Sequence, residues 1–360
     1  MPQPAQLDKQ RDAIGTGVVP NDAWLARRPA EAVLAPELPI VDPHHHLWDH
    51  KRHRYLLDDL RQDIDSPGAS LGVHRIVATV FVDCMAFYRS SGPQALKPVG
   101  ETEFANGVAA MCDSGVYGEL RACAGIVGHA DLMLGAQVAE VLAAHIQAGG
   151  GRGGRFKGIR HAGGWDASPL IHNSHTKPPP GLYGDATFRQ GFAQLAPLGL
   201  SFEAWQYHPQ LPDVIDLAQA FPDTRIILNH LGGPLGVGPY QGQAEATFAA
   251  WRQHMALLAG CANVTVKLGG LGMRIGMFDH HAQPLPPTSQ QLADAWRPWV
   301  DAAIDLFGVQ RCMFESNFPV DKGSAGYAVL WNAFKRIAAG ASASDMAALF
   351  EGTARRVYKL

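Results

Sequence analysis

The sequence lacks the features that mark secreted, membrane-spanning and nucleic-acid-binding proteins. Its five cysteines are scattered over 360 residues without a Cys-x-x-Cys pair, which indicates free thiols in a reducing compartment. No run approaches the ~18 apolar residues that a membrane span needs, and Met1–Leu38 has no cationic flank leading into an apolar stretch. A net charge of −3 gives no electrostatic reason to expect nucleic acid or an anionic membrane as a partner. These absences predict a cytoplasmic protein without a signal peptide.

The composition supplies ample material for a folded core, with 47% apolar and 18% charged residues. We expect residues 1–37 to form an N-terminal extension, helical near Asp22–Arg28, and residues 38–360 to form one domain. In that domain, short apolar runs alternate with helical stretches at spacings too long for hairpins. The expected strands are 38–41, 75–83, 120–127, 155–160, 200–206, 224–230, 263–268 and 311–315.

This alternation predicts a parallel sheet with right-handed crossovers, and eight such units fit a (β/α)₈ TIM barrel followed by C-terminal helices. A doubly wound open sheet is the alternative, but no Gly-x-Gly-x-x-Gly follows the first expected strand. In a barrel, the carboxyl ends of all the strands meet at one face, which is where active sites lie. Polar residues at those ends are therefore candidates for chemistry, although each one alone could simply mark where its strand stops.

Three consecutive histidines end the first expected strand, in Asp42-Pro-His-His-His46. Side chains alternate sides along an extended chain, so His44 and His46 share one side and His45 faces the other. Such a pair is half of a metal site or a pair of proton-transfer groups, and the alternative is a histidine-rich surface turn. The polar residues at the other strand ends are Asp83, His129, Arg160, Gln206, His208, His230, Lys267, Glu315 and Asn317.

Long loops after these strands carry further residues suited to ligand contact. Tyr88 and Arg89 follow the second expected strand, the loop 161–184 contains His172 and His175, and the loop 271–287 contains Arg274. Long loops inside a compact domain are typical of lids and binding walls, although rigid surface is the alternative for 161–184. Residues 273–281 either close over the site or form a contact between the subunits of a homo-oligomer.

The stretch Ile40–Asp49 resembles the opening signature of the amidohydrolase superfamily, in its amidohydrolase-2 branch of predicted TIM-barrel metal-dependent hydrolases. Within that branch the chain is most similar to the group of sugar-lactone, 2-pyrone-4,6-dicarboxylate and sulfomuconolactone hydrolases. Further matches follow in family order, at Phe156–His161, Ile227–Gly233, Asn263–Gly269, Phe314–Pro319 and Thr353–Tyr358.

The resemblance implies that His44 and His46 are the histidine pair of the first strand, and that His208 and His230 are the histidines of the fifth and sixth strands. The family normally places on its eighth strand an aspartate that binds metal and activates water. Asn317 stands at that position here, and a neutral amide cannot take up a proton at neutral pH.

Glu315 lies two residues before Asn317 on the same face of the strand, so we expect it to supply the missing carboxylate. Asp321 is a second candidate for that role. The alternative is that Glu315 is a structural acid paired with Arg160 or Lys267.

The implied activity is the hydrolysis of a lactone, or of a related cyclic ester or amide, by activated water. A divalent metal, with zinc the first candidate, would be held by His44, His46, His208 and Glu315, and metal-free catalysis is the alternative. A small anionic substrate would be bound by Arg160, Lys267, Tyr88, Arg89 and Arg274.

Two other functions stay open at this stage. The same branch contains metal-dependent decarboxylases of aromatic and unsaturated acids, which would use the same histidines. Because Asn317 replaces the usual base, a non-catalytic binding protein is the third reading.

Overall fold

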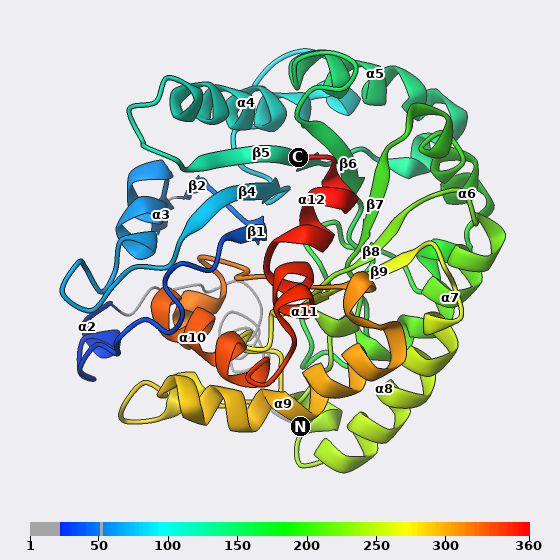
Figure 1. Cartoon of the computed structure of the whole chain (residues 1–360). Helices are drawn as coiled ribbons and strands as arrows, with labels where there is room; N and C mark the ends of the chain where they lie inside the picture. Colours follow the sequence, from blue (N-terminus) through cyan, green and yellow to red (C-terminus); the bar gives the residue numbers. More distant parts are fainter. Residues whose placement is uncertain (1–21, 51–52) are drawn as a thin grey trace.

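The computed structural model describes residues 22–50 and 53–360. Its centre is a sheet of eight strands in which each strand pairs in parallel with the next one along the chain (Figure 1). These strands are β1 (Ile40–His45), β4 (Ile76–Val82), β5 (Arg121–Gly128), β6 (Phe156–Arg160), β7 (Ser201–Ala204), β8 (Ile226–Leu228), β9 (Val264–Leu268) and β10 (Cys312–Phe314).

The last strand meets the first. His46 N donates to Phe318 O at 2.8 Å and Asn317 N donates to His44 O at 2.9 Å. The eight-unit TIM barrel expected from the sequence is therefore confirmed. A doubly wound sheet is excluded, because the strands follow one another in chain order from β1 to β10.

Helices surround the barrel, and most of them follow the strands as expected (Figure 1). They are α2 (Asp22–Leu25), α3 (Leu57–Ile64), α4 (Val99–Asp113), α5 (Val138–Ala148), α6 (Ala186–Phe192), α7 (Leu211–Ala220), α8 (Ala244–Ala259), α9 (Ser289–Phe307), α10 (Tyr327–Ile337), α11 (Ala343–Ala347) and α12 (Thr353–Tyr358). Asp185 caps α6, as its sequence predicts, by accepting from the backbone N–H groups of Thr187 and Phe188. The sequence did not predict α3, nor the hairpin of β2 (Trp48–His50) and β3 (His53–Tyr55).

The apolar interior has two layers. The larger layer lies between the barrel and the helices, and the smaller one fills the barrel itself with residues such as Val41, Val80 and Met313. The last helix, α12, closes the smaller layer with Val357 and Tyr358. In Figure 1 this terminal helix, coloured red, lies across the middle of the barrel. Among the described residues, no helix has both the length and the apolarity to cross a membrane.

The part of the N-terminal extension that is described packs on the barrel domain through backbone and side-chain contacts. Trp24 Nε1 donates to Gln283 O at 2.9 Å, and Lys335 Nζ on α10 donates to Leu34 O at 2.8 Å. The expected helix near Asp22–Arg28 is present as the single turn α2. Residues 1–21 of the expected extension lie outside the described residues.

Candidate functional site

The first strand turns its histidines inward through an irregularity at Pro43. Val41 faces the barrel interior, while Asp42 faces outward and accepts from Ser316 N at 3.0 Å and from Tyr327 Oη at 3.0 Å. The strand register shifts between Asp42 and His45, so that His44 faces inward as Val41 does. As expected, His45 points the other way, and its Nε2 lies 2.8 Å from Thr79 Oγ1.

Glu315 lies between two buried imidazoles. Its Oε1 accepts from His230 Nδ1 at 2.7 Å and from His230 N at 3.1 Å, and its Oε2 lies 2.8 Å from His44 Nδ1. All three side chains are at most 3% exposed. We call His44, His230 and Glu315 the central cluster. Glu315 therefore contacts imidazoles, as the expected replacement carboxylate would, and not a structural arginine.

Two glycines make room for this cluster. A Cβ atom on Gly270, which has a φ of +69°, would lie 2.5 Å from the His230 ring. A Cβ atom on Gly269 would lie 2.5 Å from Glu315 Cγ. Glycine is therefore needed at both positions, because only a residue without a side chain lets the backbone approach Glu315 and His230 this closely.

Within the central cluster, His230 has one free ring nitrogen. Its Nδ1 is held by Glu315, whereas no hydrogen bond of its Nε2 is found among the described residues. The ring packs edge-on against Trp205 with centroids 4.8 Å apart, which fixes its plane. A carboxylate that orients one imidazole nitrogen leaves the other nitrogen as a base.

Two cations approach the other histidine. Lys267 Nζ lies 3.2 Å from His44 Nδ1, and Arg160 Nη1 lies 3.4 Å from His44 Nε2. Each cation also has its own carboxylate: Glu203 Oε2 lies 2.8 Å from Lys267 Nζ, and Asp83 Oδ2 lies 3.9 Å from Arg160 Nε. The positive charges are therefore largely balanced within the protein.

Burial shifts the proton affinities of the cluster. Desolvation raises the pKa of Glu315 to about 8, although Lys267 opposes this shift. Desolvation, with Lys267 next in size, lowers the pKa of His44 well below 6.5. Desolvation, together with Arg160, also lowers the pKa of His230 well below that value. The imidazoles are therefore neutral at neutral pH, as a proton acceptor must be.

Asn317 and Asp321 form a second layer below the cluster. Asn317 Nδ2 donates to Asp321 Oδ1 at 2.9 Å, and Gly272 N donates to Asp321 Oδ2 at 3.0 Å. Burial raises the pKa of Asp321 to about 8. The carboxylate nearest to the histidines is thus Glu315, and Asp321 instead ties strand β10 to the loop after β9.

The other residues predicted for the site lie at different distances from it. His46 is a neighbour of His44, with ring centroids 4.9 Å apart, and its Nδ1 lies 2.8 Å from Val82 O. His208 Nδ1 accepts from Leu235 N at 3.2 Å, and its ring packs against Tyr240. Among the described residues, the group that could hold a metal consists of His44, His230 and Glu315. It includes neither His46 nor His208, which were expected as ligands.

Among the predicted substrate-binding residues, Arg160 and Lys267 reach His44, as described above. Tyr88 Oη donates to Asp83 Oδ1 at 3.0 Å, which joins it to the Arg160 side of the site. Arg89 instead pairs with Glu103, and both side chains are more than a third exposed. Arg274, in the loop 271–287, lies near His281 and lowers the pKa of that ring.

Three buried acids near the site were not among the predicted site residues. They are Glu203, which holds Lys267; Asp42, which fixes the start of the histidine run; and Glu101, whose Oε1 accepts from Ala86 N at 2.8 Å. Glu203 did leave a signal, since it is an acidic residue inside a short strand of otherwise small or apolar residues. The roles of Asp42 and Glu101 depend on contacts between distant parts of the chain.

The central cluster fits a divalent metal in its donor types. One ligand atom from each of His44, His230 and Glu315 lies within 4.8 Å of the others. Glu315 Oε2 is buried and accepts no well-oriented hydrogen bond from the described residues, so it has capacity for a further partner. Two imidazoles and a carboxylate form the ligand set of many catalytic zinc sites.

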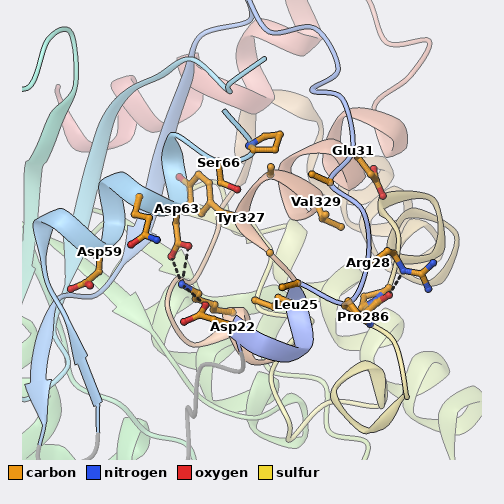
Figure 2. A pocket seen from close by; sticks show the side chains of 18 of the residues that line it. Asp22, Leu25, Arg28, Glu31, Asp59, Asp63, Ser66, Pro286, Tyr327 and Val329 are labelled. Atoms are coloured by element: carbon orange, nitrogen blue, oxygen red, sulfur yellow. Dashed lines mark hydrogen bonds and ion pairs between the residues drawn. The ribbon is translucent and has the colours of Figure 1, made fainter. Parts of the chain in front are cut away.

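A separate hollow lies between α2, α3 and α10 (Figure 2). It has a volume of about 740 Å³, and its lining includes Tyr55, Asp63 and Lys322. Lys322 Nζ lies 2.8 Å from Asp63 Oδ1 and 3.1 Å from Asp22 Oδ1. No residue of the central cluster lines this hollow.

The comparison with known proteins decides the family. The amidohydrolase family model matches residues 41–360. The chain therefore belongs to the amidohydrolase family. The uncharacterised protein y4mH of Sinorhizobium fredii is 33% identical over 334 residues, which cover 90% of this chain and 99% of that protein.

An L-fucono-1,5-lactonase sequence and a crystal structure, both from Burkholderia multivorans, are also similar to this amidohydrolase. An L-fucono-1,5-lactonase is 31% identical over 185 residues, which cover 49% of this chain and 57% of the lactonase. A crystal structure of an amidohydrolase with bound zinc has a TM-score of 0.66 and 25% identity, covering 89% of this chain and 99% of that one.

Proposed function

We propose that this amidohydrolase opens a lactone of a small hydroxylated substrate with water activated at the Glu315–His230 pair. The observation that carries the proposal is the asymmetry of the His230 ring. Glu315 holds its Nδ1 at 2.7 Å, and its Nε2 is left without a hydrogen bond to the described residues. The partial similarity to an L-fucono-1,5-lactonase supports the choice of a lactone.

In the proposed reaction, His230 Nε2 takes a proton from water while the water oxygen attacks the lactone carbonyl carbon. The ionised form of Glu315, which predominates above its raised pKa of about 8, stabilises the imidazolium that forms, as an orienting carboxylate does in other acid–base pairs. Lys267 and Arg160 stabilise the negative charge that develops on the carbonyl oxygen. The ring C–O bond then breaks, and His230 returns the proton to the alcohol oxygen of the product acid.

A divalent ion held by His44, His230 and Glu315 would polarise the carbonyl and lower the pKa of the attacking water. The two cations beside His44 weaken binding of a further positive charge, because Lys267 and Arg160 lie within 3.4 Å of its ring nitrogens. We therefore propose that the residues perform the proton transfers themselves and that a metal such as zinc binds weakly.

The charges around the site favour a hydroxylated substrate over the anionic one that the sequence suggested. Lys267 and Arg160 are each paired with a carboxylate of the protein, so the site has little net positive charge with which to bind a substrate carboxylate, although their N–H groups can still donate to a carbonyl oxygen. Gln206 is fully buried, and neither of its side-chain amide atoms is hydrogen-bonded within the described residues. Substrate hydroxyl groups would satisfy that amide, since buried polar groups are normally paired.

A substrate panel tests this proposal. Purified protein is offered neutral sugar lactones, lactones that carry carboxylates, and aromatic carboxylic acids, with acid release and CO₂ release measured separately. We expect acid release from sugar lactones, and chelator treatment should leave most of it. CO₂ release without lactone opening would replace the hydrolase with a decarboxylase, and binding of lactones without turnover would indicate a binding protein.

A further inference from the structure

The last residue of α12 reaches into the barrel. Tyr358 is 1% exposed and belongs to the apolar cluster that fills the barrel interior. The chain enters from the amino ends of the strands, since Lys157 Nζ, at the start of β6, donates to Lys359 O. From this side, the Tyr358 hydroxyl donates a hydrogen bond to Glu203 Oε1.

Glu203 is the centre of a sealed network. Its Oε2 forms an ion pair with Lys267 Nζ at 2.8 Å and accepts a hydrogen bond from Asn229 Nδ2. The side chains of Glu203 and Lys267 are 0% exposed, and Lys267 Nζ lies 5.5 Å from the centre of the Tyr358 ring. We call Tyr358, Glu203 and Lys267 the interior triad.

The interior triad ends at the central cluster, because Lys267 Nζ lies 3.2 Å from His44 Nδ1. A buried ammonium group is tolerated only where a counter-charge holds it, so Glu203 determines where Lys267 sits. Glu203 in turn has one oxygen, Oε1, held by Tyr358, and without that donor only the contacts of Oε2 with Lys267 and Asn229 orient the carboxylate.

We propose that Tyr358 is a positioning residue, which acts through Glu203 to hold the Lys267 ammonium group beside His44. This proposal rests on the proposed role of the central cluster. It gives the Thr353–Tyr358 stretch a task at the site, although α12 lies at the opposite end of the barrel from the loops around the histidines. The Thr353–Tyr358 stretch then influences catalysis through the position of Lys267.

The chain provides a matched control. Tyr55 Oη donates to Asp63 Oδ2 at 2.8 Å, Asp63 pairs with Lys322, and Lys322 Nζ lies 5.8 Å from the Tyr55 ring centre. We call Tyr55, Asp63 and Lys322 the rim triad, because it lines the hollow of Figure 2. It repeats the interior triad outside the site, so that Tyr55→Phe removes an equivalent hydroxyl group.

The experiment compares Tyr358→Phe with Tyr55→Phe in the full chain. With a lactone that the wild-type protein opens, Tyr358→Phe should lower kcat between ~10-fold and ~100-fold at unchanged KM, as misplacement of a catalytic group does. Tyr55→Phe should leave kcat within about two-fold, since its partners do not touch the cluster. Equal kcat in the two variants, or a rise in KM alone, would overturn the proposal.

A second readout does not depend on turnover. In protein labelled with ¹⁵N-lysine, the sealed Lys267 ammonium group should give a slowly exchanging NMR signal, assigned by its loss in Lys267→Arg. Tyr358→Phe should shift or broaden that signal, and Tyr55→Phe should leave it in place. A signal unchanged in Tyr358→Phe would overturn the positioning role, whereas a shifted signal in a protein that opens no lactone would overturn only the proposed function.

Discussion

The interior triad and the rim triad are built from the same three residue types, and they differ in burial and in what their lysines touch next. Both side chains of the Lys267–Glu203 pair are 0% exposed, whereas those of the Lys322–Asp63 pair are 12% and 13% exposed. Beyond its carboxylate, Lys267 contacts His44, while Lys322 contacts Asp22 of the N-terminal segment. In our proposal the same module serves chemistry in one place, and in the other it holds the N-terminal segment at Asp22.

The proton affinities of the rim triad reflect its partial contact with water. Burial alone would lower the pKa of Lys322, but Asp63 and Asp22 outweigh it and raise that pKa. Burial raises the pKa of Asp63, opposed by Lys322, and the carboxylate keeps some contact with solvent. In the interior triad both side chains of the ion pair are sealed from solvent, so Lys267 acts on His44 without screening by water, and only Glu203 opposes its charge.

The largest expected difference between the two triads follows from neutralising the carboxylate of each ion pair. Glu203→Gln leaves Lys267 buried without a counter-charge, and we expect a loss of about 3–5 kcal/mol in the free energy of unfolding. Asp63→Asn should cost about 1 kcal/mol, because Lys322 can turn towards water. Urea unfolding measures both, and equal losses would show that the two triads are equally sealed.

A double variant separates charge from packing. In Glu203→Gln/Lys267→Met no charge stays buried, so stability should return towards the wild-type value. Lactone opening should not return, because the ammonium group beside His44 is gone.

The burial of His145 should also make the free energy of unfolding depend on pH. His145 is sealed between Thr102 Oγ1 (2.8 Å) and His129 O (2.9 Å), and burial lowers its pKa from 6.5 to about 4. The folded state favours the neutral ring, so its contribution is complete above pH 6.5 and is lost as the pH falls towards 4. The loss should reach about 3 kcal/mol. Unfolding curves of His145→Gln should show a shallower decline over this range, and an unchanged slope would contradict the assignment.

Salt gives the smallest expected difference between the triads. Raising NaCl from about 0.1 M to about 1 M shortens the Debye length from about 10 Å to about 3 Å. The destabilisation caused by Lys322→Met should therefore shrink by a few tenths of a kcal/mol, in keeping with a partly exposed pair. The destabilisation caused by Glu203→Gln should not change with salt. A similar salt response in the two variants would show that the two ion pairs do not differ in their exposure to solvent.

The sequence predicted the barrel because alternation of apolar strands and helices is a local pattern that tertiary contacts did not overrule. It also singled out Glu315, but the expected face shared with Asn317 is absent, because β10 ends at Phe314 and Asn317 has a φ of +54°. His46 and His208 were expected as metal ligands, while the structure brings His230 to Glu315 in their place. That choice depends on the irregularity at Pro43 and on the close approach of Gly270, neither of which periodicity encodes.

The interior triad was beyond sequence reasoning for a related reason. Tyr358 and Glu203 are 155 positions apart, and only the closed barrel brings them together. An acidic residue within a short strand signalled that a partner was needed, but it did not identify that partner.

The central claim, that Glu315 orients the histidine base, is tested most directly by lactone turnover in Glu315→Gln. The matched control is Asp63→Asn, which changes a buried carboxylate of the rim triad without touching the cluster. We predict that Glu315→Gln lowers kcat on the order of 10³-fold while the protein stays folded, as loss of acid–base assistance does, and that Asp63→Asn leaves kcat near the wild-type value. Near-normal turnover in folded Glu315→Gln would contradict the mechanism.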